Sequence, residues 1–192
     1  MKISHIPAAL AMVLTTLVGV DAKTSGWPEP LAEALEAMAH QQANYAYTRE
    51  AWDDLGHYVE RFDPSKPRSD QWQLVSFDDA EPKEEHRNRY AKEYEGLFNR
   101  DHPADIELAD LIDRESLSVT ESTPTTITYR FKPRAEDPDD QKFMSHVDGT
   151  LLLDTEKNLV KEIRLANSKK FSPAAMVSIK KFSLTMNFDF VN

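Results

Sequence analysis

Large apolar side chains occupy every second position near the end of the chain, and this alternation restricts the fold more than any other feature. A spacing of two places side chains on the same face of a β-strand. We therefore expect a long strand between Val177 and Val191 with one strongly apolar face. The residues on that face are Phe182, Leu184, Met186, Phe188 and Phe190.

Similar alternation in earlier segments predicts more antiparallel strands, each with one buried and one solvated face. The expected strands are 44–50, 57–63, 71–78, 117–120, 127–131, 149–153 and 159–166. Turn-forming residues separate most of them. The segment from Asp154 to Asn158, for example, predicts a hairpin between two of these strands.

Two segments have the spacing of amphipathic helices. Leu31 to Gln42 has apolar residues at intervals of three and four. A second helix should begin after Glu81-Pro82, with acidic residues in its first turn, and run to about Phe98 on the surface of the sheet. The sequence thus predicts one α+β domain. We expect its curved antiparallel sheet to form an incomplete, half β-barrel, with helices covering the concave face.

Residues 1–22 have the order of a cleavable signal peptide: a basic start at Lys2, an apolar run, and a small-residue cleavage site. The apolar run, from Ile6 to Val20, is shorter than the about 20 residues that span a bilayer. We therefore expect a periplasmic protein whose single domain covers residues 23–192 and contains no membrane span. No cysteine follows the run, so we expect no lipid anchor.

The composition narrows the expected partners. The chain has 33 acidic and 23 basic residues, with a formal net charge of -10. Such a surface repels phosphate backbones, so we expect no nucleic-acid partner, and the same repulsion disfavours steady binding to anionic lipid headgroups. The absence of cysteine from the sequence excludes disulfides and thiolate metal sites.

The sequence contains none of the catalytic motifs considered below. No two histidines have the four-residue spacing of metal ligands on a helix, and we expect all six to be surface residues. They are His5, His40, His57, His86, His102 and His146. Ser145-His146 lacks the glycines of a nucleophile elbow, and acidic pairs such as Asp139-Asp140 are typical of solvated turns. We therefore expect no enzyme, no cofactor and no metal site.

The apolar strand faces are the strongest functional signal in the sequence. The candidate ligand-binding residues are Trp72, Tyr129, Phe131, Phe182, Leu184, Met186, Phe188 and Phe190. In one interpretation the two helices cover these residues as an ordinary core. In the other, two modest helices cannot fill the concave face and leave a cavity for an apolar ligand. Burial of an acyl chain would contribute about 0.8 kcal/mol per methylene.

Three stretches carry a resemblance to a known family. They are 58–64 with 71–74, the strand 127–131, and 149–154 through 171–173. In their order along the chain they resemble the LolA-like superfamily of periplasmic lipoprotein carriers, and most closely its uncharacterised exported members from Gram-negative bacteria. The resemblance implies the half-barrel fold and a periplasmic location. It rests on pattern and order rather than on a signature motif, so no functional residue is carried over.

Two functions from different classes are consistent with these features. The first is non-catalytic binding or carriage of an apolar group, with a lipid or an acylated protein as partner. The alternative is an interaction module of the cell envelope that docks a protein partner through an exposed edge strand and has no ligand cavity. The sequence ends at Asn192, just after the last apolar strand. Three explanations are consistent with this end: the sheet is short, the sequence is truncated, or the last strand is an edge that a partner completes.

Overall fold

The computed structural model describes residues 26–40, 45–53, 56–67, 70–98, 108–172 and 178–190. The predicted signal peptide, residues 1–22, lies outside these ranges, as do His5 and His102. The side chains of His40 and Phe190 also lie outside the description.

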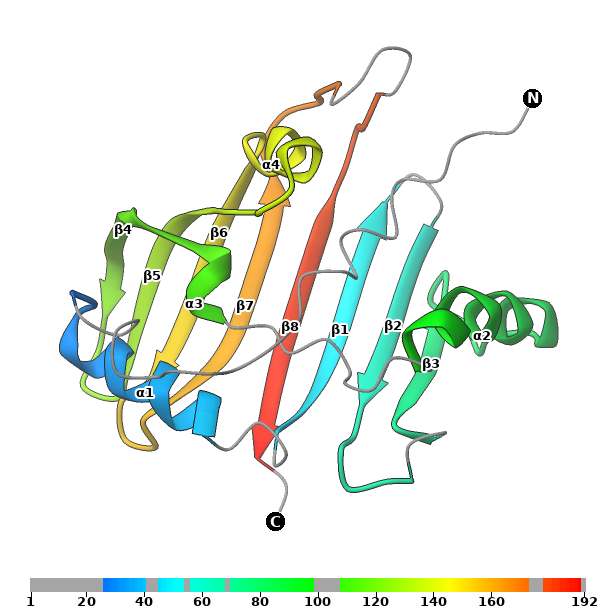
Figure 1. Cartoon of the computed structure of the whole chain (residues 1–192), viewed down its shortest axis with the longest axis horizontal. Helices are drawn as coiled ribbons and strands as arrows, with labels where there is room; N and C mark the ends of the chain where they lie inside the picture. Colours follow the sequence, from blue (N-terminus) through cyan, green and yellow to red (C-terminus); the bar gives the residue numbers. More distant parts are fainter. Residues whose placement is uncertain are drawn as a thin grey trace.

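Eight strands form one antiparallel sheet in the order β3-β2-β1-β8-β7-β6-β5-β4 (Figure 1). The strands are β1 (Tyr45–Asp53), β2 (Gly56–Phe62), β3 (Trp72–Phe77), β4 (Ile112–Ser122), β5 (Thr126–Pro133), β6 (Val147–Asp154), β7 (Leu159–Asn167) and β8 (Ser183–Phe190). Each predicted strand overlaps one of these. The sheet is open, because β3 and β4 are not paired with each other, and it is not strongly curled.

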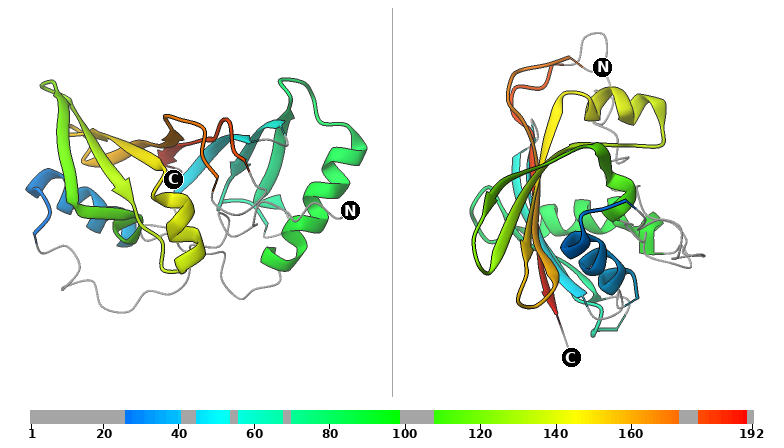
Figure 2. Two further views of the ribbon diagram at one scale, coloured as in Figure 1. Left: turned by 90° about the horizontal axis from the view of Figure 1, so that it is seen from above. Right: turned by 90° about the vertical axis from the view of Figure 1, so that its left-hand side faces the viewer.

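Four helices are found in the described ranges, and together with the sheet they give an α+β fold. They are α1 (Glu29–His40), α2 (Glu84–Phe98), α3 (Leu108–Leu111) and α4 (Pro138–Met144). All four lie on the same side of the sheet (Figure 2), which we call the helix side. Helices α1 and α2 are those expected from sequence, whereas α3 and α4 are too short to show a helical period.

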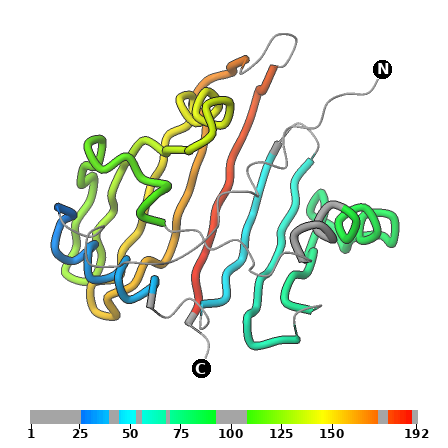
Figure 3. The backbone as a smooth tube through the Cα atoms, viewed as in Figure 1, coloured from blue at the N-terminus to red at the C-terminus, as the bar shows by residue number. Residues whose placement is uncertain are grey.

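The last strand is not an edge of the sheet, so of the three alternatives for the end of the sequence, the exposed edge completed by a partner was wrong. Strand β8 pairs with both β1 and β7, with Phe188 opposite Tyr47 and Leu184 opposite Leu165. Figure 3 shows the first and last strands side by side in cyan and red. A strand with one strongly apolar face buries more of that face when neighbours flank it on both sides.

The true edges, β3 and β4, both contain irregularities. The register of β3 against β2 shifts between Val59 and Glu60, and β4 has two such shifts against β5. Val75 on β3 and Val119 on β4 are exposed by 51% and 56%. Bulges of this kind disturb the regular ladder that a further strand would need for pairing.

The main core lies between α1 and the strands β5 to β8. Apolar residues of α1 are buried over β7. They are Leu31, Ala34, Leu35 and Met38, the residues whose spacing predicted the helix. Tyr129 and Phe131 on β5 are only 2% and 1% exposed, and Leu151 and Ile163 continue this layer on β6 and β7.

One glycine in this core makes room for an aromatic ring. Gly149 on β6 lies opposite Phe131 on β5. A Cβ atom at position 149 would lie 2.4 Å from the Cε2 and Cζ atoms of the Phe131 ring. Real Cβ atoms do not approach other carbons so closely, and the ring is buried, so a side chain at this position forces the core to shift.

We therefore predict that Gly149→Ala destabilises the protein by about 1–3 kcal/mol, the usual cost of overpacking. At an ordinary strand position the same change would stabilise, because alanine is preferred to glycine there. Urea unfolding measures the free energy. As a control, Gly149→Ala in a Phe131→Leu background should cost much less. Equal costs in the two backgrounds would contradict the contact.

The predicted hairpin at Asp154 is confirmed between β6 and β7. Asp154 Oδ1 accepts hydrogen bonds from the backbone N–H groups of Glu156 at 3.1 Å and Lys157 at 3.0 Å. The bond from Lys157 is the largest cause that lowers the pKa of Asp154 below its ordinary 3.8. Asn158 ends the turn in a left-handed conformation (φ 53°) and donates from Nδ2 to Glu33 of α1.

A lowered pKa in the folded protein means that the unfolded chain binds the proton more readily. The Asp154 carboxylate therefore stabilises the fold above the unfolded pKa of about 3.9, and this contribution is lost as the pH falls through the lower, folded pKa. We expect Asp154→Asn to reduce the free energy of unfolding at neutral pH, and the difference from the original protein to shrink below about pH 4. A difference that stays constant over a urea-unfolding series from neutral to acidic pH would refute this assignment.

Candidate functional site

Four aromatic rings form a row across β8, β1, β2 and β3 on the helix side of the sheet. This aromatic row consists of Phe188, Tyr47, Phe62 and Trp72. Tyr47 lies opposite both Phe188 and Phe62, and Phe62 lies opposite Trp72. The ring centroids of these three pairs are 5.8, 5.3 and 5.1 Å apart. All four side chains are half-buried, unlike the rings of the main core.

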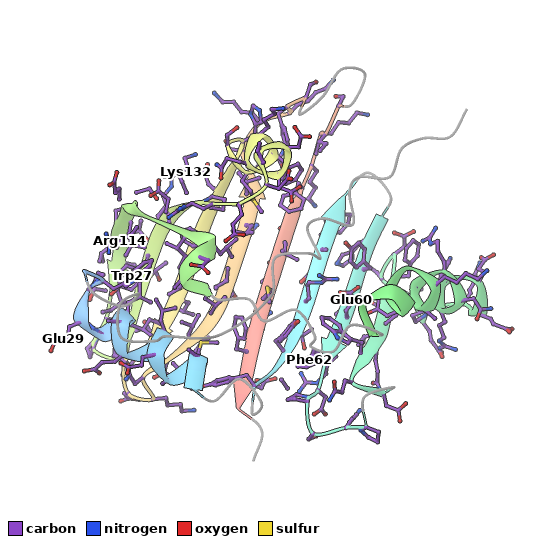
Figure 4. The ribbon with its side chains drawn as sticks, in the orientation of Figure 1. Trp27, Glu29, Glu60, Phe62, Arg114 and Lys132 are labelled. Carbon is purple, nitrogen blue, oxygen red and sulfur yellow. The ribbon has the colours of Figure 1, made fainter. Side chains whose placement is uncertain are left out.

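An ion pair lies beside the row. Its two residues are each two positions away from a ring of the row along the same strand, and so they lie on the same face. Arg49 on β1 is opposite Glu60 on β2, and both Nε and Nη2 of Arg49 contact Glu60 Oε2. The side chains are 12% and 1% exposed. The Arg49 guanidinium carbon is 5.7 Å from the centre of the Trp72 ring, within the range of a cation–π contact. Figure 4 shows Glu60 and Phe62 as neighbours in this part of the sheet.

The ionisable groups at the row favour contact with an uncharged ligand. Burial is the main cause that raises the pKa of the Tyr47 phenol well above its usual range. The positive charge of Arg49 opposes this rise, and the negative charge of Glu60 adds to it. The phenol therefore stays protonated at physiological pH and cannot serve as a base or nucleophile there. Arg49 and Glu60 neutralise each other, so among the described residues the charges beside the row belong to an ion pair.

The helices cover the two halves of the sheet differently. Their main contacts are α1 with β7, α3 with β4, α4 with β6, and α2 with the edge strand β3. Within the described part of the chain, three of the row's strands, β1, β2 and β8, are not among these main helix partners (Figures 1 and 2). This uneven cover agrees with the half-burial of the row and the full burial of the aliphatic core.

The structure divides the predicted ligand-binding residues into two groups. Trp72 and Phe188 belong to the aromatic row, and the Phe190 side chain is outside the described residues. The other predicted residues are buried in the core: Tyr129, Phe131, Phe182, Leu184 and Met186. Phe182 packs against Phe143 of α4 with centroids 4.9 Å apart. Their role in binding stays a prediction.

Sequence reasoning missed four residues of this site, although a signal for them exists. Tyr47 and Arg49 are two positions apart, as are Glu60 and Phe62, so each pair shares a strand face. The hairpin pairs Asp53 with Gly56, and this register brings Arg49 opposite Glu60. On one strand a basic residue shares a face with an aromatic residue, and on the next strand an acidic residue does the same. This pattern indicates a buried ion pair beside a cluster of rings.

The opposite side of the sheet holds a buried histidine, which corrects the expectation that all histidines are surface residues. The Nδ1 atom of His57 is 2.8 Å from Asp79 Oδ1, and its Nε2 atom is 3.0 Å from Glu50 Oε1. Its ring stacks on Trp52 at 4.2 Å. Carboxylates from two other segments satisfy both ring nitrogens, which makes burial of the polar ring acceptable. Among the described residues, no group of three or more His, Asp or Glu side chains is arranged to hold a metal ion.

Comparison with known proteins does not assign the chain to a family. No protein-family model matches the sequence, and no curated protein matches it. Within the ranges that the structure describes, no helix is both long and apolar enough to cross a membrane. The resemblance to lipoprotein carriers therefore stays a prediction, and the site must be judged on its own geometry.

The ion pair of the site should be far more sensitive to mutation than a surface pair in the same strands. Arg49→Met removes the ion-pair partner of the buried Glu60 carboxylate, and we expect a loss of about 3–5 kcal/mol in the free energy of unfolding. The double variant Arg49→Met/Glu60→Leu should recover most of this loss, because no buried charge remains. Chemical denaturation measures both.

A matched control is the pair Arg61–Asp189, which joins β2 to β8 on the opposite face at 3.1 Å and is partly exposed. Arg61→Met should cost about 0–1 kcal/mol. If Arg49→Met and Arg61→Met cost the same, the Arg49–Glu60 pair is not desolvated as described.

Proposed function

We propose that this protein is an exported, non-catalytic binder or carrier of an apolar group, either a lipid or the acyl chain of an acylated protein. The observation that carries the proposal is the aromatic row: four rings that are only partly buried, on the side of the sheet that is elsewhere closed by helices. The row is the surface that the ligand would contact.

The chemistry of the row suits hydrocarbon better than an ionic ligand. Aromatic side chains bury a large apolar area, and each methylene of a bound acyl chain contributes about 0.8 kcal/mol. Arg49 already has Glu60 as its partner, so a ligand charge would have to compete with a desolvated ion pair. The neutral Tyr47 phenol likewise favours binding without reaction.

Other features support the wider proposal. The signal-peptide pattern of residues 1–22 supports export to the periplasm. An antiparallel sheet with the four described helices on one side supports the resemblance to the LolA-like half-barrel, with the helix side as the concave face. The open sheet would make a shallow trough rather than a deep barrel.

The alternative, an envelope module that docks a protein through an edge strand, has weaker support. The apolar strand that suggested it lies inside the sheet. The actual edges, β3 and β4, are interrupted by register shifts. Regular strand addition needs an uninterrupted row of backbone donors and acceptors.

Tryptophan quenching tests the location of the ligand. In Trp27→Phe/Trp52→Phe the only remaining tryptophan is Trp72, in the aromatic row. We expect a fatty acid with a brominated chain to quench its fluorescence in a saturable manner, because bromine would lie against the ring. The matched variant Trp27→Phe/Trp72→Phe keeps only Trp52, on the opposite face, and should show little quenching. Equal quenching in both variants, or none in either, would reject the site.

A charge placed in the row should abolish binding. We expect Phe188→Asp to lower the affinity for the same fatty acid at least tenfold, since a carboxylate within an apolar site must be desolvated. Asn187→Asp is the matched control, because it adds the same charge to the same strand on the exposed face. Native mass spectrometry should recover an acyl ligand from the control and not from Phe188→Asp. Circular dichroism establishes that both variants are folded.

A further inference from the structure

The segments that connect β7 to β8 carry the same four residues twice. Lys-Lys-Phe-Ser occurs at 169–172 and again at 180–183. The two segments run antiparallel, and Phe171 and Ile179 exchange both backbone hydrogen bonds, at 3.1 and 2.9 Å. They extend beyond the end of the sheet near α4 (Figure 1). We call Lys169, Lys170, Lys180 and Lys181 the lysine cluster.

The backbone under the lysine cluster is firmly held. The side-chain amide of Asn167 donates from Nδ2 to the carbonyl oxygens of Lys169 at 3.0 Å and Lys180 at 3.3 Å. Its Oδ1 accepts from the backbone N–H of Phe182 at 2.7 Å. One asparagine thus connects both segments. Phe171 and Phe182 are buried, and both rings pack edge-on against Phe143 of α4.

The charges of the lysine cluster are concentrated and exposed. All four residues are exposed, and none has a carboxylate within ion-pair distance among the residues that the structure describes. The Lys181 ammonium lies 3.7 Å from the centre of the Trp52 ring. The Phe171–Ile179 bridge brings Lys170 across from Lys180, and like charges in facing positions destabilise a strand pair. An anionic partner would relieve this repulsion.

We infer that the lysine cluster is a docking surface for anionic lipid headgroups at a membrane surface. Lysine ammonium groups are point charges that suit a fluid layer of phosphates, whereas arginine would suit a fixed bidentate partner. A lipid surface also needs no shape complementarity from segments that project beyond the sheet. This inference is independent of the ligand proposed for the aromatic row.

The net charge of -10 does not oppose this inference. Charges more than about 8–10 Å from the contact are largely screened at physiological ionic strength. A local group of four positive charges therefore decides the interaction at close range. Each lysine next to an anionic membrane surface should raise the binding constant roughly fivefold.

Vesicle flotation tests the inference on the full chain. We expect binding to vesicles of equal parts phosphatidylglycerol and phosphatidylcholine, much weaker binding to phosphatidylcholine alone, and loss of binding at high salt. Lys170→Gln/Lys180→Gln should lower the partition coefficient roughly 30-fold. The control Lys83→Gln/Lys92→Gln removes the same charge from exposed positions at α2 and should have little effect. Residues 1–22 are common to all variants, so their contribution cancels.

Three results would overturn the inference: similar losses in the two double variants, equal binding to both vesicle types, or binding to soluble polyglutamate without binding to any vesicle. The last would point to an acidic protein as the partner. Lys170→Gln/Lys180→Gln should leave the quenching of Trp72 by the brominated fatty acid unchanged, because both lysines lie outside the aromatic row. Failure of the lysine test and failure of the fatty-acid test are therefore distinguishable.

Discussion

The pairing of β8 with β1 joins two hairpin units, β1 to β3 and β4 to β7, into one sheet. It brings the first strand of the fold beside the last, and its register sets Tyr47 next to Phe188 and Arg49 next to Met186. Phe188 joins the aromatic row only because this non-local pairing forms. Any loss of register between β1 and β8 would separate Phe188 from the other three rings.

The buried ion pair fits this view of the sheet. A buried pair gives little net stability compared with well-packed apolar residues, but it constrains the register of the strands that carry it. A slip of one position between β1 and β2 would turn either Arg49 or Glu60 to the opposite face and leave the other charge buried alone. The pair therefore penalises the alternative alignments that a row of similar aromatic rings would tolerate.

Local elements of the fold could be predicted from the sequence, because their signals are local. The alternation in β5, β7 and β8, the spacing of α1, and the turn after Asp154 all appear in the structure. The interior position of β8 could not be predicted, since alternation shows which face of a strand is apolar but not which strands lie beside it. The burial of His57 was missed for a similar reason: its partners Glu50 and Asp79 come from separate segments. The division of the predicted ligand residues between core and row depends on helix placement, which periodicity does not encode.

Net charge sums over a surface on which unlike regions are separated, so it does not describe the charge of any one region. The lysine cluster and the aromatic row are both connected to β8, through Lys181 at its start and Phe188 near its end. At about 3.3 Å per residue, these positions are roughly 20 Å apart along the strand, about twice the screening length in physiological salt. The lysines therefore have little electrostatic influence on the row. The connection between the two regions is mechanical, through one strand whose backbone hydrogen bonds to β1 and β7 hold both in place.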